Sequence, residues 1–318
     1  MDRKMRILIS YDGSDHANEV LRNLGRAGLP PEAEAIVIST TDTSFLTPGK
    51  YRKNGAANLS AADLTETMNK ATALARHASE MIRKDFPDWE VRINLAVGTT
   101  LRVIAKKAGG WNPDLIVIGS QKYSATSNSI FSAFSRRVDA TMNCSIRIAQ
   151  KFPAVTEVEE NSDFGSRILV CVEGASRAEA IVGSVASRFW PRGTEVRLLT
   201  VVNPCNYSIV DPPDEKIKQT KLLHRRLAHE LDDSPVHTTS VIKEGEPAKI
   251  ILKEAAEWKP DCMFIGTGRI SRLHRWLNGS LSESLVARSQ CPIELVGTAR
   301  ATSPLTQLLR LPATLLGL

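Results

Sequence analysis

Short apolar runs alternate with longer amphipathic stretches along most of this chain. In the first half the apolar runs lie at Ile7–Ser10, Ala35–Ser39, Val91–Ala96, Leu115–Ile118 and Ile146–Ala149. Between them, apolar residues three and four positions apart predict helices over Ser14–Gly28, Ser60–Lys84, Thr100–Ala108 and Ser132–Met142. Continuous apolar strands that alternate with helices are typical of a parallel sheet covered on both faces. We therefore predict a doubly wound, Rossmann-like α/β fold.

The same pattern occurs a second time. At an offset of 147 residues Gly98 matches Gly245, and Pro113-Asp114 matches Pro260-Asp261. Nearer the N-terminus the offset is 161, so that Arg6-Ile-Leu matches Arg167-Ile-Leu. Self-similarity at a nearly fixed offset indicates a duplicated unit. We predict two tandem domains, each with a five-stranded parallel sheet, over residues 1–150 and 166–298.

Two further segments follow from these boundaries. Residues 151–165 contain Pro153 and a short acidic run, and we expect them to link the domains. Residues 299–318 form a tail whose leucines have approximately helical spacing. The tail is expected to pack on its own domain, and packing on a partner is the alternative.

Composition narrows the functional class. The chain has 318 residues, of which 42% are hydrophobic and 24% charged, as in ordinary globular domains. The formal charge of +6 is dispersed along the chain, so it does not predict nucleic-acid binding. No run reaches the length of a membrane span, and the N-terminus lacks the apolar core of a signal peptide. We expect a cytoplasmic protein without membrane partners.

Cysteine and histidine give no sign of metal or redox chemistry. Five cysteines occur without a Cys-x-x-Cys motif, mostly in apolar runs, which predicts buried thiols. They are Cys144, Cys171, Cys205, Cys262 and Cys291. The six histidines lack metal-ligand spacing, and we expect surface positions for them.

One glycine-containing stretch is a candidate anion site. Phe264–Gly266 predicts the end of a buried strand, a basic loop follows, and a helix opens near Gly279-Ser280. Backbone N–H groups at such a helix start can hold phosphate. In a doubly wound sheet the ligand lies where the strand order reverses, beyond the first and fourth strands. The loops at Asp12 and Gly119 should therefore meet in one copy, and those at Glu173 and Gly266 in the other.

Several of these motifs together resemble the universal stress protein family. They are Arg6–Ser14, Gly245-Glu-Pro247, Asp261 before the strand that ends at Gly266, Gly279-Ser280, and Cys291-Pro-Ile. The resemblance covers both copies. It implies paired domains, within the chain and, as an open alternative, between two chains as a homodimer. In one branch of the family it also implies the binding of ATP, with Mg as companion ion.

The ATP-binding branch carries Gly, two residues, Gly, nine residues, Gly, and then Ser or Thr. In the second copy Gly266, Gly279 and Ser280 match, but Arg269 replaces the middle glycine. A guanidinium there either grips phosphate or fills the pocket. In the first copy only Gly119 matches.

The resemblance also implies an acidic residue after the first strand and an apolar residue against adenine at the end of the second. The first copy has Asp12 but Thr40 in these places, and the second has Val201 but Glu173. Each copy therefore departs from the pattern, and the second is the better candidate for the nucleotide.

Three functions remain open at this point. The preferred one is a stress-response protein in which a bound adenine nucleotide biases the association of the domains. The second is an interaction scaffold that has lost its nucleotide. The third is a slow ATP hydrolase, for which Asp12 or Glu173 would supply the carboxylate. We do not expect an enzyme and assign no catalytic residue, because Ser271 and His274 lack a carboxylate partner for a triad.

Overall fold

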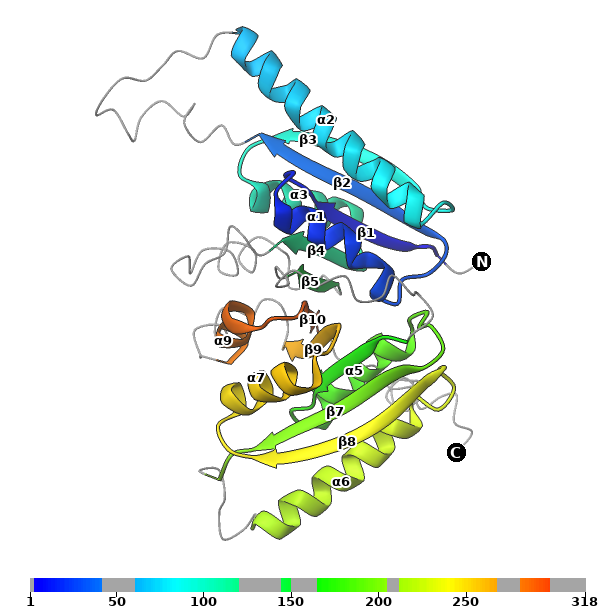
Figure 1. The fold of residues 1–318 in the computed structure, drawn as a ribbon, viewed down its shortest axis with the longest axis vertical. Coiled ribbons are helices and arrows are strands. Elements are labelled where there is room, and N and C mark those ends of the chain that lie inside the picture. The colour runs from blue at the N-terminus through cyan, green and yellow to red at the C-terminus, as the bar shows by residue number, and fades with distance from the viewer. Residues whose placement is uncertain are drawn as a thin grey trace, which may run out of the picture.

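The computed structural model describes residues 3–41, 61–119, 144–149, 165–204, 212–267 and 281–297. These residues form two α/β domains, one above the other in Figure 1. The N-terminal domain contains β1–β5 and the C-terminal domain contains β6–β10. The predicted helix Ser132–Met142, the linker, the tail, Cys205 and the residues Arg269, Gly279 and Ser280 lie outside the described residues.

In the N-terminal domain the predicted strands and the first three predicted helices form in the expected order. Ser14 caps α1, because its side chain accepts a hydrogen bond from the Ala17 amide. This helix is shorter than predicted, since it ends at Arg22 and a single 3-10 turn follows. The elements are β1 (Met5–Ser10), α1 (Asp15–Arg22), η1 (Leu24–Arg26), β2 (Ala33–Thr41), α2 (Ala61–Asp85), β3 (Glu90–Val97), α3 (Thr100–Trp111), β4 (Leu115–Gly119) and β5 (Ser145–Ala149).

The C-terminal domain repeats this order. Helix α7 ends at Lys259 in the left-handed conformation, as α3 ends at Asn112, so the repeat extends to the helix ends. The elements are β6 (Arg167–Cys171), α5 (Ala175–Ala186), β7 (Thr194–Val202), α6 (Pro213–His229), β8 (Val236–Glu244), α7 (Pro247–Trp258), β9 (Cys262–Thr267), α9 (Leu281–Arg288) and β10 (Ile293–Gly297).

Each domain has a parallel sheet with the same strand order. In the N-terminal domain it is β3-β2-β1-β4-β5, and in the C-terminal domain it is β8-β7-β6-β9-β10. The order reverses between β1 and β4, and again between β6 and β9. The doubly wound fold is confirmed, together with the edges at which ligands were expected.

The two sheets join into one. Strand β5 pairs with β10 in antiparallel register, with Arg147 opposite Glu294, so that a ten-stranded sheet crosses both domains. On one face of the sheet the hydrophobic core continues across this junction, where Ile146 and Leu295 belong to the same buried cluster. The domains are therefore paired within the chain by backbone hydrogen bonds and by a shared core.

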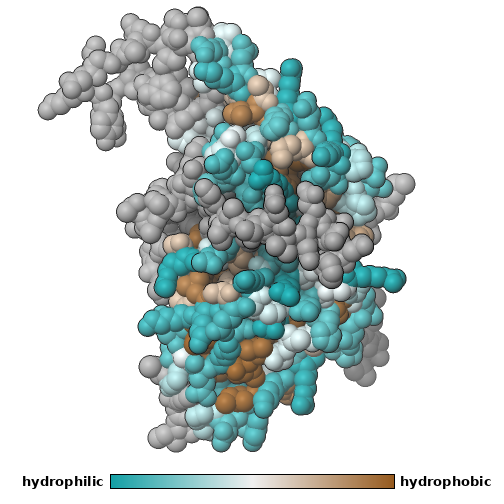
Figure 2. Space-filling view, in the orientation of Figure 1, coloured by the Kyte–Doolittle hydropathy of each residue, from teal (hydrophilic) through white to brown (hydrophobic). Residues whose placement is uncertain are grey.

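The surface seen in Figure 2 is mostly hydrophilic, with apolar patches on the C-terminal domain. Among the described helices, none is long and apolar enough to cross a membrane. The four described cysteines are buried free thiols, as predicted. Burial raises the pKa of the Cys262 thiol to about 12, so this thiol stays protonated and unreactive at neutral pH.

Candidate functional site

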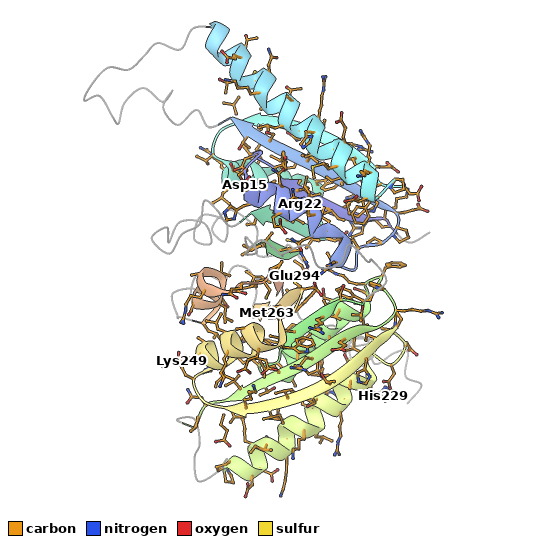
Figure 3. All side chains as sticks on the ribbon, viewed as in Figure 1. Asp15, Arg22, His229, Lys249, Met263 and Glu294 are labelled. Carbon is orange, nitrogen blue, oxygen red and sulfur yellow. The ribbon has the colours of Figure 1, made fainter. Side chains whose placement is uncertain are left out.

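A cavity of about 1120 Å³ lies in the C-terminal domain at the carboxyl ends of β6, β7 and β9. The β6–α5 turn contributes Glu173 and Gly174, β7 contributes Val201, and β9 ends in the wall at Gly266. Helix α6 covers one side, and in Figure 3 its last residue, His229, lies on that helix away from the junction of the domains. The cavity therefore occupies the edge at which the strand order reverses.

Three of the predicted site residues meet in this cavity. Glu173 follows β6, Val201 lies near the end of β7 and Gly266 near the end of β9, and the parallel sheet brings these strand ends together. The Glu173 carboxylate accepts a hydrogen bond of 2.9 Å from Arg177 Nη1, one helical turn later. An acidic group is thus fixed at the cavity mouth beside a cation.

Gly266 is needed for packing as well as for turning. A Cβ at this position would lie 2.9 Å from Ile181 Cδ1 and 3.3 Å from the Arg177 Cβ. The absence of a side chain lets α5 lie directly against the end of β9. This glycine therefore shapes the floor of the cavity, whatever ligand enters it.

The corresponding residues of the N-terminal domain are engaged with their own neighbours. Asp12 Oδ1 accepts hydrogen bonds from the Ser14 amide at 3.1 Å and from Ser14 Oγ at 2.6 Å. The Thr40 hydroxyl is 2.7 Å from the Thr100 hydroxyl. A Cβ on Gly119 would meet the His16 Cβ at 3.6 Å, so the first turn of α1 lies against the end of β4.

The two domains differ in how their long helix meets the turn after the first strand. In the N-terminal domain Leu74 of α2 packs on Gly13, and a Cβ there would clash with Leu74 Cδ2. In the C-terminal domain the matching Gly174 has nothing within 4 Å of such a Cβ. The space that Leu74 fills in one domain is part of the cavity in the other.

The side chains on the buried faces of α2 and α6 explain this difference between the domains. When the buried positions of α2 and α6 are matched, Ala75 and Ala78 correspond to His224 and Leu227. The small residues let α2 lie against both β2 and β3, whereas α6 contacts mainly β8. The larger side chains hold α6 away from β7, and the cavity opens in the gap.

His224 corrects the prediction that the histidines lie on the surface. Its side chain is buried between α6 and the sheet, with Nδ1 2.6 Å from Ser240 Oγ and Nε2 2.8 Å from Thr200 Oγ1. Thr200 Oγ1 in turn donates to the Val172 carbonyl, so Nε2–H donates to Thr200 and Nδ1 accepts from Ser240. Burial lowers the pKa of His224 to about 4, and the ring is neutral.

The sequence analysis missed the contribution of α6 to the cavity. Lys216, Thr220, Leu223 and Arg226 line it, spaced three or four residues apart on one helical face. That spacing was a usable signal. It was not used because the expected glycine motif lies after β9, far from α6 in the sequence.

No metal centre is formed within the described part of the chain. There, no group of three or more His, Cys, Asp or Glu residues is placed to hold an ion.

Comparisons with known proteins agree with this architecture. The sequence profile of the Universal stress protein family matches residues 5–149 and 166–297. A universal stress protein from Methanothermobacter thermautotrophicus (strain Delta H) is 42% identical over 59 residues, which are 19% of this chain and 40% of that protein. The chain thus matches less than half the length of that relative.

Among solved structures, a universal stress protein from Archaeoglobus fulgidus DSM 4304 has a TM-score of 0.64 at 18% identity, covering 92% of this chain and 96% of its own. An Arabidopsis thaliana family protein with AMP bound is 18% identical and has a TM-score of 0.31, covering 44% of this chain and 96% of its own. Because the family profile matches both halves, the chain belongs to the universal stress protein family, in its tandem two-domain form.

Proposed function

We propose that the C-terminal domain binds an adenine nucleotide in the α6 cavity, and that the protein acts as a nucleotide-responsive stress protein rather than as an enzyme. The observation that carries this proposal is the convergence of Glu173, Val201 and Gly266 on one cavity. These residues lie at or just after the ends of β6, β7 and β9, and the family pattern names their positions.

The chemistry of the wall fits a nucleoside. Val201, Ile251 and Ile265 give an apolar surface for a flat base, and Glu173 offers oxygens to ribose hydroxyls. The cavity is at the upper end of the range for small-molecule sites, which leaves room beyond the nucleoside. A mostly apolar pocket with a few fixed polar groups is the usual form of a cofactor site.

The phosphates have two sources of positive potential in this proposal. The family motif assigns them to Gly279 and Ser280, which follow β9, and we add Arg269, which stands where the motif has a glycine. Lys216 and Arg226 lie along the cavity on α6 and add cationic groups. ATP with Mg²⁺ is our preferred form of the ligand, because the extra charge and length use both groups of residues.

The proposal assigns one nucleotide to each chain. In the N-terminal domain Asp12 is held by Ser14, Thr40 by Thr100, and Leu74 covers Gly13. The role of the N-terminal domain is then to pair with the C-terminal one. Signalling follows if the nucleotide stabilises one arrangement of the elements around α6. The cytoplasmic location stays a prediction from the sequence.

A matched pair of variants tests the site. Ligand that binds only the folded state raises its stability by RT ln(1 + [L]/Kd), so MgATP should raise the melting temperature of the wild type. Glu173→Ala should weaken this effect by at least about tenfold in apparent Kd, since it removes a charge-assisted contact. Asp12→Ala removes the equivalent carboxylate of the N-terminal domain and should leave the effect unchanged.

Other outcomes distinguish the alternatives. If neither ATP nor AMP changes the melting temperature of the wild type, the nucleotide proposal is wrong and the scaffold takes its place. If Asp12→Ala abolishes the effect and Glu173→Ala does not, the site lies in the N-terminal domain. Phosphate release that depends on Glu173 would support the hydrolase.

A further inference from the structure

The junction between the domains places two opposite charges at equivalent positions. Arg147 and Glu294 are 147 residues apart, which is the offset of the internal repeat, and they face each other in the β5–β10 register. The local two-fold axis that relates the domains therefore passes between them. Both side chains are almost fully buried, at 1% and 0% exposure, and Arg147 Nη1 is 3.4 Å from Glu294 Oε2.

A third charge completes the group. Arg188, buried at the end of α5, donates to Glu294 Oε1 and, through Nη1, to the Ala27 carbonyl of the N-terminal domain at 2.8 Å. One carboxylate is thus held between two guanidinium groups. In Figure 3 Glu294 is labelled at the junction of the two domains. We call Arg147, Arg188 and Glu294 the seam triad.

Pairing of like domains would break this arrangement. Two C-terminal domains joined through β10 would place Glu294 opposite Glu294, and two N-terminal domains joined through β5 would place Arg147 opposite Arg147. Like charges at such buried positions repel strongly, and Arg147 would lose its acidic partner, whereas Glu294 would keep Arg188 of its own domain. The attraction between Arg147 and Glu294 exists only between unlike domains.

Side-chain size at the junction of the two domains also favours the pairing of unlike domains. The Phe189 amide donates to the Gly28 carbonyl at 3.0 Å, and the Trp190 ring lies 2.7 Å from where a Cβ on Gly28 would be. At the repeat offset, Ala27 and Gly28 of one domain correspond to Arg188 and Phe189 of the other. Small residues therefore face large ones, whereas like pairing would set large against large or small against small.

A surface ion pair also joins the two domains. Arg26 Nη1 of the N-terminal domain is 2.8 Å from Asp261 Oδ1 of the C-terminal domain. The residue equivalent to Arg26 in the C-terminal domain is Ser187, which cannot make such a pair with Asp114. The buried charges and the side-chain sizes thus favour unlike domains, whereas the Arg26–Asp261 pair disfavours only the pairing of two C-terminal domains.

We propose that the seam triad makes β5 and β10 select each other, so that the chain closes on itself and neither strand is available for a homodimer. The surface fits one kind of partner, an antiparallel strand with a cation opposite Glu294. Specificity of this kind is a difference between affinities and does not require the triad to add net stability. This inference does not depend on the proposed nucleotide site.

Competition between the two domains tests the proposal. A protease site is inserted between β5 and β6 in the full chain, the folded protein is cleaved there, and the fragments are unfolded and refolded together. Native mass spectrometry then counts like and unlike pairs. For the wild type we expect unlike pairs to exceed like pairs by at least about tenfold, because buried like charges disfavour the alternatives.

The key variant is Arg147→Met, Arg188→Met and Glu294→Met combined, since buried ion clusters can be replaced by apolar residues without loss of folding. Like pairs should then rise at least about fivefold above the wild-type level. Arg92→Met, which changes an exposed arginine on β3, is the control and should behave as the wild type. If the triple variant does not fold, Glu294→Gln keeps the shape and should also yield pairs of C-terminal domains.

Two results would overturn the proposal. One is a wild type whose refolded fragments give like and unlike pairs in statistical proportion. The other is a folded variant, triple or Glu294→Gln, whose fragments still pair only with the unlike domain, because the choice would then not depend on charge.

Discussion

The two domains have the same strand order, but their long helices lie differently. In the N-terminal domain α2 packs on the turn after β1, whereas in the C-terminal domain α6 is held away from the turn after β6. In the N-terminal domain Ala75 lets α2 approach the sheet, and Leu74 closes over Gly13. In the C-terminal domain His224 stands at the position of Ala75, and Gly174 borders a cavity. A few buried residues on one helix thus separate a filled edge from an open one, while the strands that define the fold are unchanged.

This difference also divides the work between the domains. The N-terminal domain presents small residues at the seam, Ala27 and Gly28, and has its candidate ligand groups engaged with one another. The C-terminal domain supplies Arg188 and Trp190 to the seam and carries the cavity. In the proposed function the N-terminal domain supports the pairing and the C-terminal domain holds the nucleotide.

The largest expected effect concerns His224, the residue that separates the two helices. Its folded pKa of about 4 lies below the ordinary value of 6.5, so the unfolded chain binds more protons between these values. The contribution of the neutral ring is complete above pH 6.5 and is lost as the pH falls toward 4. We expect this loss to be roughly 3 kcal/mol, from about 1.4 kcal/mol per pKa unit.

The variant His224→Ala tests this loss of stability, because it replaces the histidine by the residue that the N-terminal domain has there, Ala75. At pH 7 the variant should be less stable than the wild type, because it loses two buried hydrogen bonds and leaves a void. The gap should narrow as the pH falls to 4. Urea denaturation at several pH values measures it, and a gap that stays constant over this range would show that His224 does not titrate as described.

A smaller loss of stability is expected when Gly13 or the matching Gly174 is replaced by alanine. Gly13 and Gly174 have nearly the same φ, +76° and +74°, and Gly174 has a ψ of +151°, a combination that almost only glycine adopts. Ala at either place should therefore cost about 1–3 kcal/mol. At Gly13 the new Cβ must also displace Leu74, which should add about 1 kcal/mol of overpacking. Gly13→Ala should therefore destabilise the protein more than Gly174→Ala does.

The double variant Gly13→Ala, Leu74→Ala provides the control for this pair. In the Leu74→Ala background the clash is gone, so adding Gly13→Ala should cost only the backbone strain seen at Gly174. Thermal unfolding of the wild type, the three single variants and the double variant is sufficient. Equal costs at Gly13 and Gly174 in the wild-type background would mean that α2 does not pack on the turn as closely as the structure shows.

The fold could be predicted because its signal is local. Apolar runs and helical spacing fix the order of elements, and the repeat offset places them twice, so the position of the ligand edge followed from topology. Topology placed the loops at Glu173 and Gly266 at this edge, and the family resemblance added Val201. Each residue lies at or just after the end of a strand, where sequence position and place in space are tightly linked.

The distance of α6 from the sheet and the register in which β5 pairs with β10 could not be predicted in the same way. His224 was expected on the surface, because a single histidine on an amphipathic helix does not show whether the helix lies close to the sheet. The pairing of β5 with β10 joins strands that are far apart in the chain, and its register is visible only when both edges are in place. Only that register shows that Arg147 and Glu294 face each other.

The most direct test of the account is the stoichiometry of nucleotide binding to the full chain. Isothermal titration of the purified protein with MgATP, and separately with AMP, measures it without any variant. The account predicts saturable binding of one nucleotide per chain, in the C-terminal cavity. Two equivalent sites per chain would contradict the difference between the domains, and no heat up to millimolar nucleotide would contradict the nucleotide site itself.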